Sequence, residues 1–273
     1  MHVTRDMPTN PDSDGGCTAG ELHFDVSVYS GDAPYPRHRH DELQLSLILR
    51  GAVSETSCGR NEIGRALSIV SKDSGLYHAD DFPPEGAKIA RLSLPDAIIN
   101  DLLDDRHRID GWKWTHDPRI ARPFLSLVRR ARDHSQKSFA ACDPDVIDLL
   151  AAFSARTPAR DGGKPPAWLR QTITELRHTW QPGMKVRDVA RRAGVHPVYL
   201  ARCVRRWYGT GIGDELRRLR LTAAVAMLTS DESTVSSIAH GSGYSDEPHL
   251  CRATHEMLGV TPRRLRSLVT SIA

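Results

Sequence analysis

Arg202 and Arg252 occupy equivalent positions in two copies of an internal repeat, and their side chains are suited to contact a polyanion. A guanidinium group can make paired hydrogen bonds to O6 and N7 of guanine and can also bind phosphates. On a helical wheel each arginine lies about 200° from the preceding leucine, Leu200 or Leu250, and therefore away from the apolar stripe. One exposed arginine is often merely solvated, whereas two at equivalent positions favour a contact.

Each copy of the repeat has the pattern of a helix, a glycine, a short turn and a second helix. Residues 186–194 resemble residues 235–243 at an offset of 49, and beyond the turn the offset is 50. Gly194 and Gly243 suit the left-handed conformation that ends a first helix. The pattern is typical of a helix-turn-helix motif, whose second helix enters the major groove of DNA.

The segment between the copies, Ile212–Thr229, has about 18 residues and predicts a helix of ~27 Å. Successive major grooves on one face of a duplex are ~34 Å apart, so a rigid connecting helix could present both recognition helices to neighbouring groove segments. Helices are predicted throughout this part of the chain. Their expected starts are Pro166, Lys185, His196, Ile212, Thr234, Ser245 and Thr261.

The net charge of +3 hides a difference between two parts of the chain. Residues 1–166 carry a formal charge of −4, and residues 167–273 carry +7. The Pro- and Gly-rich segment 157–166 lies at the boundary and has no apolar periodicity, which indicates a linker. A basic domain behind an acidic one favours a polyanionic partner. We expect residues 167–273 to fold alone, with both motif cores closed locally around the connecting helix.

Composition excludes several classes of protein. Apolar residues make up 39% of the chain and charged residues 26%, which predicts a globular fold. No apolar run approaches the ~20 residues that a membrane span needs. The five cysteines form no CxxC pair, which argues against a zinc ribbon or disulfide framework and fits a reducing cytosol. Residues 1–20 lack the apolar region of a secretory leader and are predicted to be a disordered tail.

The region before the linker predicts strands and then helices. The leucines of Leu43–Leu49 alternate with other residues, which predicts a strand with one face in a core, and Gly51 is expected to end it. Further strand candidates are residues 22–29, 66–71 and 89–94, an arrangement that predicts a barrel or sandwich. Helices are expected at Asp96–Asp104, at Asp117–His134 with a kink or late start at Pro123, and at Asp143–Ala155. The predicted fold class is α+β with two domains.

Residues 167–271 resemble the AraC/XylS family of transcription regulators. The resemblance rests on the segments Val189–Arg202, Leu216–Leu221, Ile238–Arg252 and Gly259–Arg266. The chain departs from the family pattern at Val204 and Thr254, where a phenylalanine is usual late in each recognition helix. The resemblance implies a seven-helix DNA-binding domain at residues 167–273. It also implies an N-terminal cupin-like sensor and dimerisation domain, here residues 21–156.

DNA contacts are predicted for residues on and beside the outward faces of the two recognition helices. In the first copy these are His196, Val198, Tyr199, Ala201, Arg202, Arg205 and Arg206, and in the second they are Glu247, His249, Arg252 and His255. The apolar stripes are predicted to face the core. They are Leu200, Cys203, Val204 and Trp207 in the first copy and Leu250, Ala253, Thr254 and Met257 in the second.

A set of histidines near the first strands is similar to the cupin pattern HxHxxxE followed by PxGxxH. Gln44 stands in place of the glutamate and Asp73 in place of the proline. Imidazole and side-chain oxygen suit divalent Fe, Mn, Ni or Zn, but the same residues could form an effector pocket or be purely structural. The resemblance to regulators implies a cupin shape without a catalytic metal, so no metal, cofactor or catalytic residue is predicted. Effector contacts are assigned to His38, His40, Gln44, Tyr77 and His78.

The predicted function is that of a sequence-specific DNA-binding transcription regulator, not an enzyme, controlled by a small-molecule effector. Double-stranded DNA, an effector of unknown identity and a second copy of the chain are the expected partners, with RNA polymerase as a further one. The dimer contacts are expected from the helices between Asp96 and Ala155, and the location is expected to be cytoplasmic. The regulator could be an activator or a repressor. Two alternatives are a cupin metalloenzyme fused to a DNA-binding module, recognised by stoichiometric metal and turnover, and an effector-independent architectural protein, recognised by sequence-independent affinity.

Overall fold

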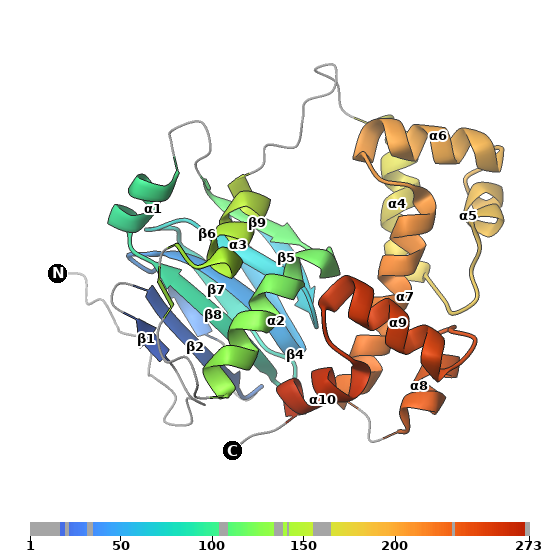
Figure 1. Cartoon of the computed structure of the whole chain (residues 1–273). Coiled ribbons are helices and arrows are strands. Elements are labelled where there is room, and N and C mark those ends of the chain that lie inside the picture. The colour runs from blue at the N-terminus through green and yellow to red at the C-terminus, as the bar shows by residue number, and fades with distance from the viewer. Residues whose placement is uncertain are drawn as a thin grey trace.

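A computed structural model of the chain describes residues 17–19, 22–31, 35–103, 109–133, 139–140, 142–154, 165–230 and 233–270. A sheet-rich N-terminal domain is followed by an all-helical C-terminal domain, which confirms the α+β class (Figure 1). The predicted linker lies outside the described residues apart from Pro165 and Pro166. Most of the predicted tail is also outside them, but Cys17–Ala19 form a strand. Within the described residues no helix is both long and apolar enough to cross a membrane.

The described residues contain nine strands in two antiparallel sheets that share one long strand. The strands are β1 Cys17–Ala19, β2 Leu22–Tyr29, β3 Tyr35–His38, β4 Leu43–Ser57, β5 Arg60–Arg65, β6 Ile69–Lys72, β7 His78–Asp81, β8 Ala87–Leu94 and β9 Trp112–Thr115. The first sheet has the order β1-β2-β8-β4-β6-β9. The second contains β3, β7, the end of β4 and β5. This two-sheet arrangement fits the cupin-like domain that was expected.

Strand β4 does not end at Gly51, so that expectation is wrong. Gly51 has a φ of +74°, and a Cβ at this position would come within 2.0 Å of the Gly86 carbonyl oxygen. Glycine therefore lets the strand pass close to its neighbour and continue into the second sheet. Residues 66–68 form the turn before β6, which begins at Ile69 and not at Ala66.

Both faces of β4 are buried, so the alternation of apolar and polar residues does not mark one buried face and one solvent-exposed face. Leu45 and Leu47 lie in the main apolar core beneath the helices. Gln44 and Ser46 are 6% and 3% exposed, because their face is covered by the second sheet. The polar face of the strand is therefore inside the barrel, where polar groups need partners.

Three helices come after β8, with β9 between the first two, and their apolar faces cover the first sheet. They are α1 Asp96–Leu102, α2 Pro118–Arg132 and α3 Pro144–Ser154. The Asp117 carboxylate accepts a hydrogen bond from the Arg119 amide and caps α2. Pro123 lies inside α2, so a late start there is wrong, and the missing N–H removes one helical hydrogen bond. The expected helix ends at Asp104, His134 and Ala155 lie outside the described residues.

The C-terminal domain is helical throughout, with the predicted starts largely confirmed. Its helices are α4 Ala167–Thr179, α5 Val186–Arg192, α6 Pro197–Tyr208, α7 Ile212–Ser230, α8 Val235–Gly241, α9 Glu247–Leu258 and α10 Pro262–Thr270. The cap of α9 is Asp246, not the expected Ser245. The Asp246 carboxylate accepts a 2.7 Å hydrogen bond from the His249 amide, whereas the Ser245 hydroxyl contacts the Asp246 carboxylate and the His249 ring.

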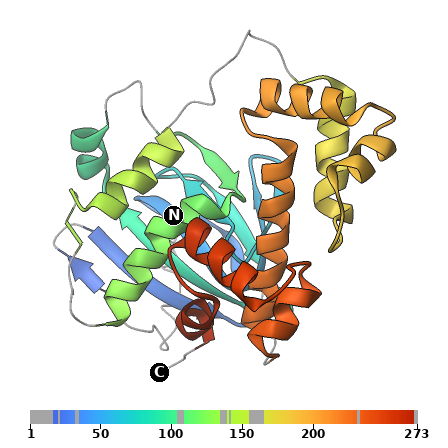
Figure 2. The same cartoon turned by 45° about the vertical axis from the view of Figure 1, so that its right-hand side comes forward.

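The two halves of the C-terminal domain differ in how their cores are closed. Helices α4–α6 form a separate apolar cluster with the start of α7. Helices α8–α10 instead share the main core of the N-terminal domain, and α9 lies beside α2 in both views (Figures 1 and 2). Arg132 donates a 2.6 Å hydrogen bond to the Ser267 carbonyl oxygen, and Arg264 lies 3.2 Å from the Asp133 carboxylate. Local closure is therefore correct for the first motif and wrong for the second.

Candidate nucleic-acid interface and histidine cluster

Helix α6 is the second helix of the first motif, and its two faces differ as expected. His196 caps it, with the ring nitrogen accepting from the Val198 amide. Leu200 and Val204 are buried, and Cys203 and Trp207 are partly buried against the same cluster. The residues on the outward face are exposed, including His196, Val198, Tyr199, Arg202, Arg205 and Arg206, whereas Ala201 is half-buried.

Val198 and Tyr199 make the outward face of α6 partly apolar. Val198 is 66% exposed and Tyr199 is 44% exposed. The Tyr199 ring stacks on Trp168 of α4, with 5.8 Å between ring centroids and 19° between planes. Exposed side chains of this kind next to arginines suit the edges and methyl groups of bases in a major groove.

Helix α9 occupies the equivalent place in the second motif. Leu250 and Thr254 are fully buried, and Arg252 and His255 are exposed. Thr254 replaces an apolar residue without leaving a buried hydroxyl unpaired, because it donates a 2.8 Å hydrogen bond to the Leu250 carbonyl oxygen.

Two of the residues predicted on α9 are held by neighbours within the protein. The His249 ring packs edge-on against Tyr244 at 5.0 Å and is half-buried. Glu247 lies 3.6 Å from the Arg263 guanidinium. Arg252 and His255 are therefore the better-presented members of the set.

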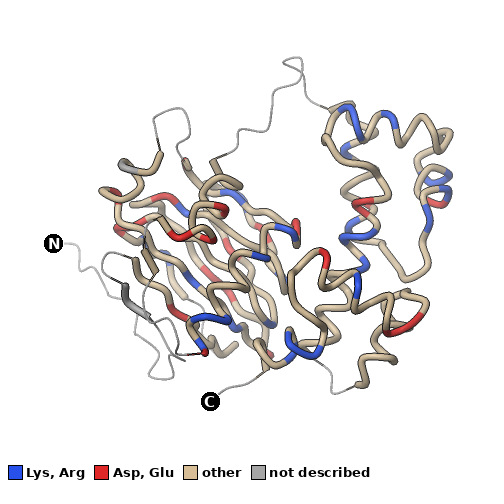
Figure 3. The backbone as a smooth tube through the Cα atoms, in the orientation of Figure 1, with Lys and Arg blue, Asp and Glu red and all other residues tan. Residues whose placement is uncertain are grey.

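Helix α7 fixes the separation of the two motifs. It contains 19 residues, which corresponds to about 28 Å. It runs between the α4–α6 cluster and α8–α10 in Figure 2. Arginines recur along α5, α6 and α7, as Figure 3 shows, so the domain carries much of the positive charge of the chain.

The sequence from α5 to α10 matches a known domain. A helix-turn-helix domain model matches residues 189–267. These residues are an AraC-type helix-turn-helix domain. The AraC-type domain contains both motifs, the connecting helix and the residues that carried the resemblance.

Relatives of the chain include two curated proteins. The regulatory protein PocR of Salmonella typhimurium is 24% identical over 197 residues, covering 66% of this chain and 61% of PocR. The HTH-type transcriptional regulator GlxA of Rhizobium meliloti is 36% identical over 196 residues, covering 60% of each. The match thus spans about three fifths of the length of these relatives. Among solved structures, ToxT from Vibrio cholerae is 10% identical with a TM-score of 0.37, covering 92% of this chain and 99% of ToxT.

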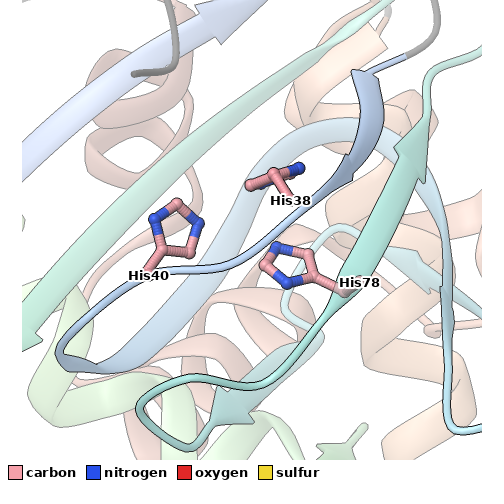
Figure 4. A group of neighbouring side chains, drawn as sticks. All are labelled: His38, His40 and His78. Atoms are coloured by element: carbon pink, nitrogen blue, oxygen red, sulfur yellow. The ribbon is translucent and has the colours of Figure 1, made fainter. Parts of the chain in front are cut away.

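A second candidate site lies in the N-terminal domain, where three of the predicted histidines come together (Figure 4). His38 ends β3, His40 follows it, and His78 begins β7. Ring centroids are separated by 4.2 Å for His38 and His78, 5.0 Å for His38 and His40, and 5.2 Å for His40 and His78. One potential ligand atom from each lies within 4.8 Å of the others.

The histidine cluster is electrically neutral at pH 7. Burial lowers the pKa of all three rings, and the Lys72 ammonium lowers it further. The pKa of His40 falls to about 3. Neutral imidazoles can accept hydrogen bonds or bind metals, so electrostatics alone leaves both roles open.

Lys72 contacts one side of the cluster. Its ammonium donates to Glu55 Oε2 at 2.9 Å and to His78 Nε2 at 3.2 Å, and all three residues are buried. The Trp112 indole also donates to the Glu55 carboxylate. A divalent cation bound through both His78 Nε2 and Glu55 would face this ammonium at a few ångströms, so these two donors do not fit a metal together.

Two residues predicted with the histidines are placed differently. Gln44 is buried on β4, and its Oε1 has no hydrogen-bond partner within the described residues. Tyr77 is 45% exposed and lies beneath the Arg37 and Arg39 guanidiniums, 4.7 and 5.4 Å from the ring centroid. Tyr77 therefore lies partly on the outer surface, and its effector contact stays a prediction.

Sequence reasoning missed the charged residues inside the barrel. Lys72, Glu55, Asp80 and Arg91 line its interior together with aromatic side chains. A signal was present in the sequence, because residues that face the interior of a barrel alternate with outward residues along every strand, and these charged residues stand on strands. The ion pair between Lys72 and Glu55 could be seen only in the fold. Lys72 lies on β6, which pairs with the first half of β4, whereas Glu55 lies on the second half of β4, which pairs with β7.

Proposed function

We propose that the protein is a sequence-specific DNA-binding transcription regulator whose helices α6 and α9 enter neighbouring major-groove segments of one duplex. The observation that carries the proposal is the repetition of an exposed arginine, Arg202 and Arg252, at equivalent positions on two capped helices. Both relatives named above are described as regulators, which supports the regulatory role. We assign no catalytic role to the chain.

Selection of bound sites from random duplexes tests this proposal. The full-length protein is expected to enrich two short sequence elements about one helical turn apart, and binding should weaken steeply with salt. Enrichment of only one element would contradict the proposal that both α6 and α9 contact bases. Recovery of unselected sequence with strong affinity would favour an architectural protein instead.

We further propose that the barrel holds a small polar effector beside the histidine cluster. Two buried atoms, His38 Nε2 and Gln44 Oε1, have no hydrogen-bond partner within the described residues, and they offer a ring nitrogen and a carbonyl oxygen to a ligand. Substitution His38→Ala should then change the response of DNA binding to cell extracts or metabolite panels. Unchanged response in His38→Ala and Gln44→Ala would leave these residues a structural role.

Homodimerisation is proposed through α3. The helix buries Val146 and Leu149 against the core, while Ile147 is 40% exposed on its other side. Helix α2 is less available, because it is covered by α3 and α9. Sedimentation of the full-length protein and of Ile147→Asp at micromolar concentration tests this: the wild type should be dimeric and the variant monomeric.

A further inference from the structure

A cavity of about 750 Å³ lies where the two domains meet. Strand β9 and the start of α2 form one wall, and α4, α6, α7 and α9 form the other. The volume is within the ~300–1,000 Å³ typical of small-molecule sites. The cavity is separate from the histidine cluster, and none of the exposed arginines predicted to contact DNA lines it.

The helical wall carries more positive charge than its ion pairs neutralise. Arg177 and Arg218 share a single carboxylate, Glu215, at 2.8 and 2.6 Å. Burial raises the pKa of Glu215, but the hydrogen bonds and charges of these two arginines lower it to about 2, so it is ionised at pH 7. One positive charge therefore remains on this triad.

Arg220 is a second cation on that wall, and the structure pairs it with no carboxylate in the described residues. Its guanidinium lies 5.6 Å from the centroid of the Tyr244 ring, and its Nε is buried without a hydrogen-bond partner. Glu256, which also lines the cavity, is exposed and neutralises only one of the two surplus charges. Arg217 on the same wall and Arg119 on the opposite wall also line the cavity, and each is paired with an aspartate.

The opposite wall is aromatic. The Trp114 ring stacks on His116 with 6.1 Å between centroids and 14° between planes. Gly64 makes room for it, since a Cβ there would lie 2.3 Å from the indole. Trp114 Nε1 is buried and has no partner within the described residues. His116 is neutral at pH 7, because burial and then the Arg218 and Arg177 charges lower its pKa to about 4.

We propose that this cavity binds a flat organic monoanion, whose carboxylate meets Arg220 and whose ring lies against Trp114 and Tyr244. The surplus of one positive charge selects a monoanion over a neutral molecule. The occupant touches both domains and the recognition helix α9 through His249 and Ala253. This site goes beyond the proposed DNA binding and does not depend on it.

Calorimetry on the full-length protein tests the site with matched probes: benzoate, indole-3-acetate and 2-naphthoate, each beside its neutral amide. At least one acid is expected to bind roughly tenfold or more tightly than its amide, as a charge-assisted contact requires. Arg220→Gln should reduce the affinity of the acid to that of the amide. Trp114→Phe should weaken the binding of both the acid and the amide, because a smaller aromatic ring takes the place of the indole. Arg60→Gln removes an exposed arginine of β5 that does not line the cavity, so it is the control and should change little.

Equal affinity for acid and amide, binding unchanged in Arg220→Gln, or no binding of any acid at millimolar concentration would each overturn the inference. Circular dichroism shows whether the variants are folded. If Arg220→Gln is unfolded, Trp114→Phe still tests the site. Fluorescence anisotropy with a selected duplex is measured in parallel. DNA binding without acid binding rejects this site alone, whereas acid binding without DNA binding rejects the proposed function alone.

Discussion

At the scale of single residues, the arginines opposite the apolar stripes carry the sharpest prediction. Arg252→Ala should weaken binding to a selected duplex by ~1–3 kcal/mol and relax the preference at one base pair, if it contacts a base. If it contacts only phosphate, the loss should be similar for all sequences and the salt slope should fall by about one. Arg202→Ala should cost less, because Arg205 and Arg206 are adjacent.

The control for both arginine variants is Arg60→Ala, which removes an exposed arginine from β5 in the other domain. Thermal unfolding should be nearly unchanged in all three proteins, since none of the side chains is in a core. Wild-type affinity in both Arg202→Ala and Arg252→Ala, with folding intact, would contradict the assignment of the outward faces.

His116 predicts how stability depends on pH. Its pKa in the folded protein is about 4, below the ordinary 6.5, so between these values the unfolded chain binds a proton that the folded chain does not. The stability linked to neutral His116 is fully present above pH 6.5 and is lost as the pH falls towards 4. The raised pKa of Asp80, about 6, acts in the opposite direction, because burial keeps its carboxyl protonated in the folded state.

Denaturant unfolding of the wild type and of His116→Gln between pH 7.5 and pH 4.5 isolates this contribution. The wild type should lose stability with falling pH more steeply than His116→Gln. The exposed His178→Gln is the matched control and should follow the wild type. Parallel curves for wild type and His116→Gln would mean that this ring is not a determinant of the pH dependence.

At the scale of elements, the start of α9 separates two capping residues. Asp246→Ala removes the carboxylate that accepts from the His249 amide and should lower the melting temperature and the affinity for DNA, because α9 would fray at its groove-facing end. Ser245→Ala should have a smaller effect on both, since its hydroxyl satisfies no backbone amide of the helix. The reverse order in melting temperature would restore Ser245 as the cap.

At the scale of the whole molecule, the shared core predicts how an isolated C-terminal domain behaves. The fragment 167–273 should be helical by circular dichroism, because α4–α6 close their own core. It should also bind an apolar dye and resist proteolysis less in α8–α10, because Leu265 and Leu268 lose the cover of the N-terminal domain. Uniform protection from proteolysis, with no dye binding, would mean that both motifs are independent after all.

The sequence by itself determined what depends on near neighbours in the chain. The apolar stripes of α6 and α9, the outward Arg202 and Arg252, and the alternation of β4 all follow from a period of 3.6 or 2, which local sequence displays. Cap positions shifted by one residue, from Ser245 to Asp246, because both side chains can accept a hydrogen bond and only the backbone geometry selects one.

The tertiary structure alone decided what depends on contacts between distant segments. Three features each join residues far apart in sequence, and no local period encodes such pairing. They are the passage of β4 beyond Gly51, the contact of the Lys72 ammonium with His78, and the burial of α9 and α10 against α2. For the same reason the cavity at the domain junction had no signature in the sequence. Its walls come from β9 and from α7, and their charges and rings meet only when the two domains pack together.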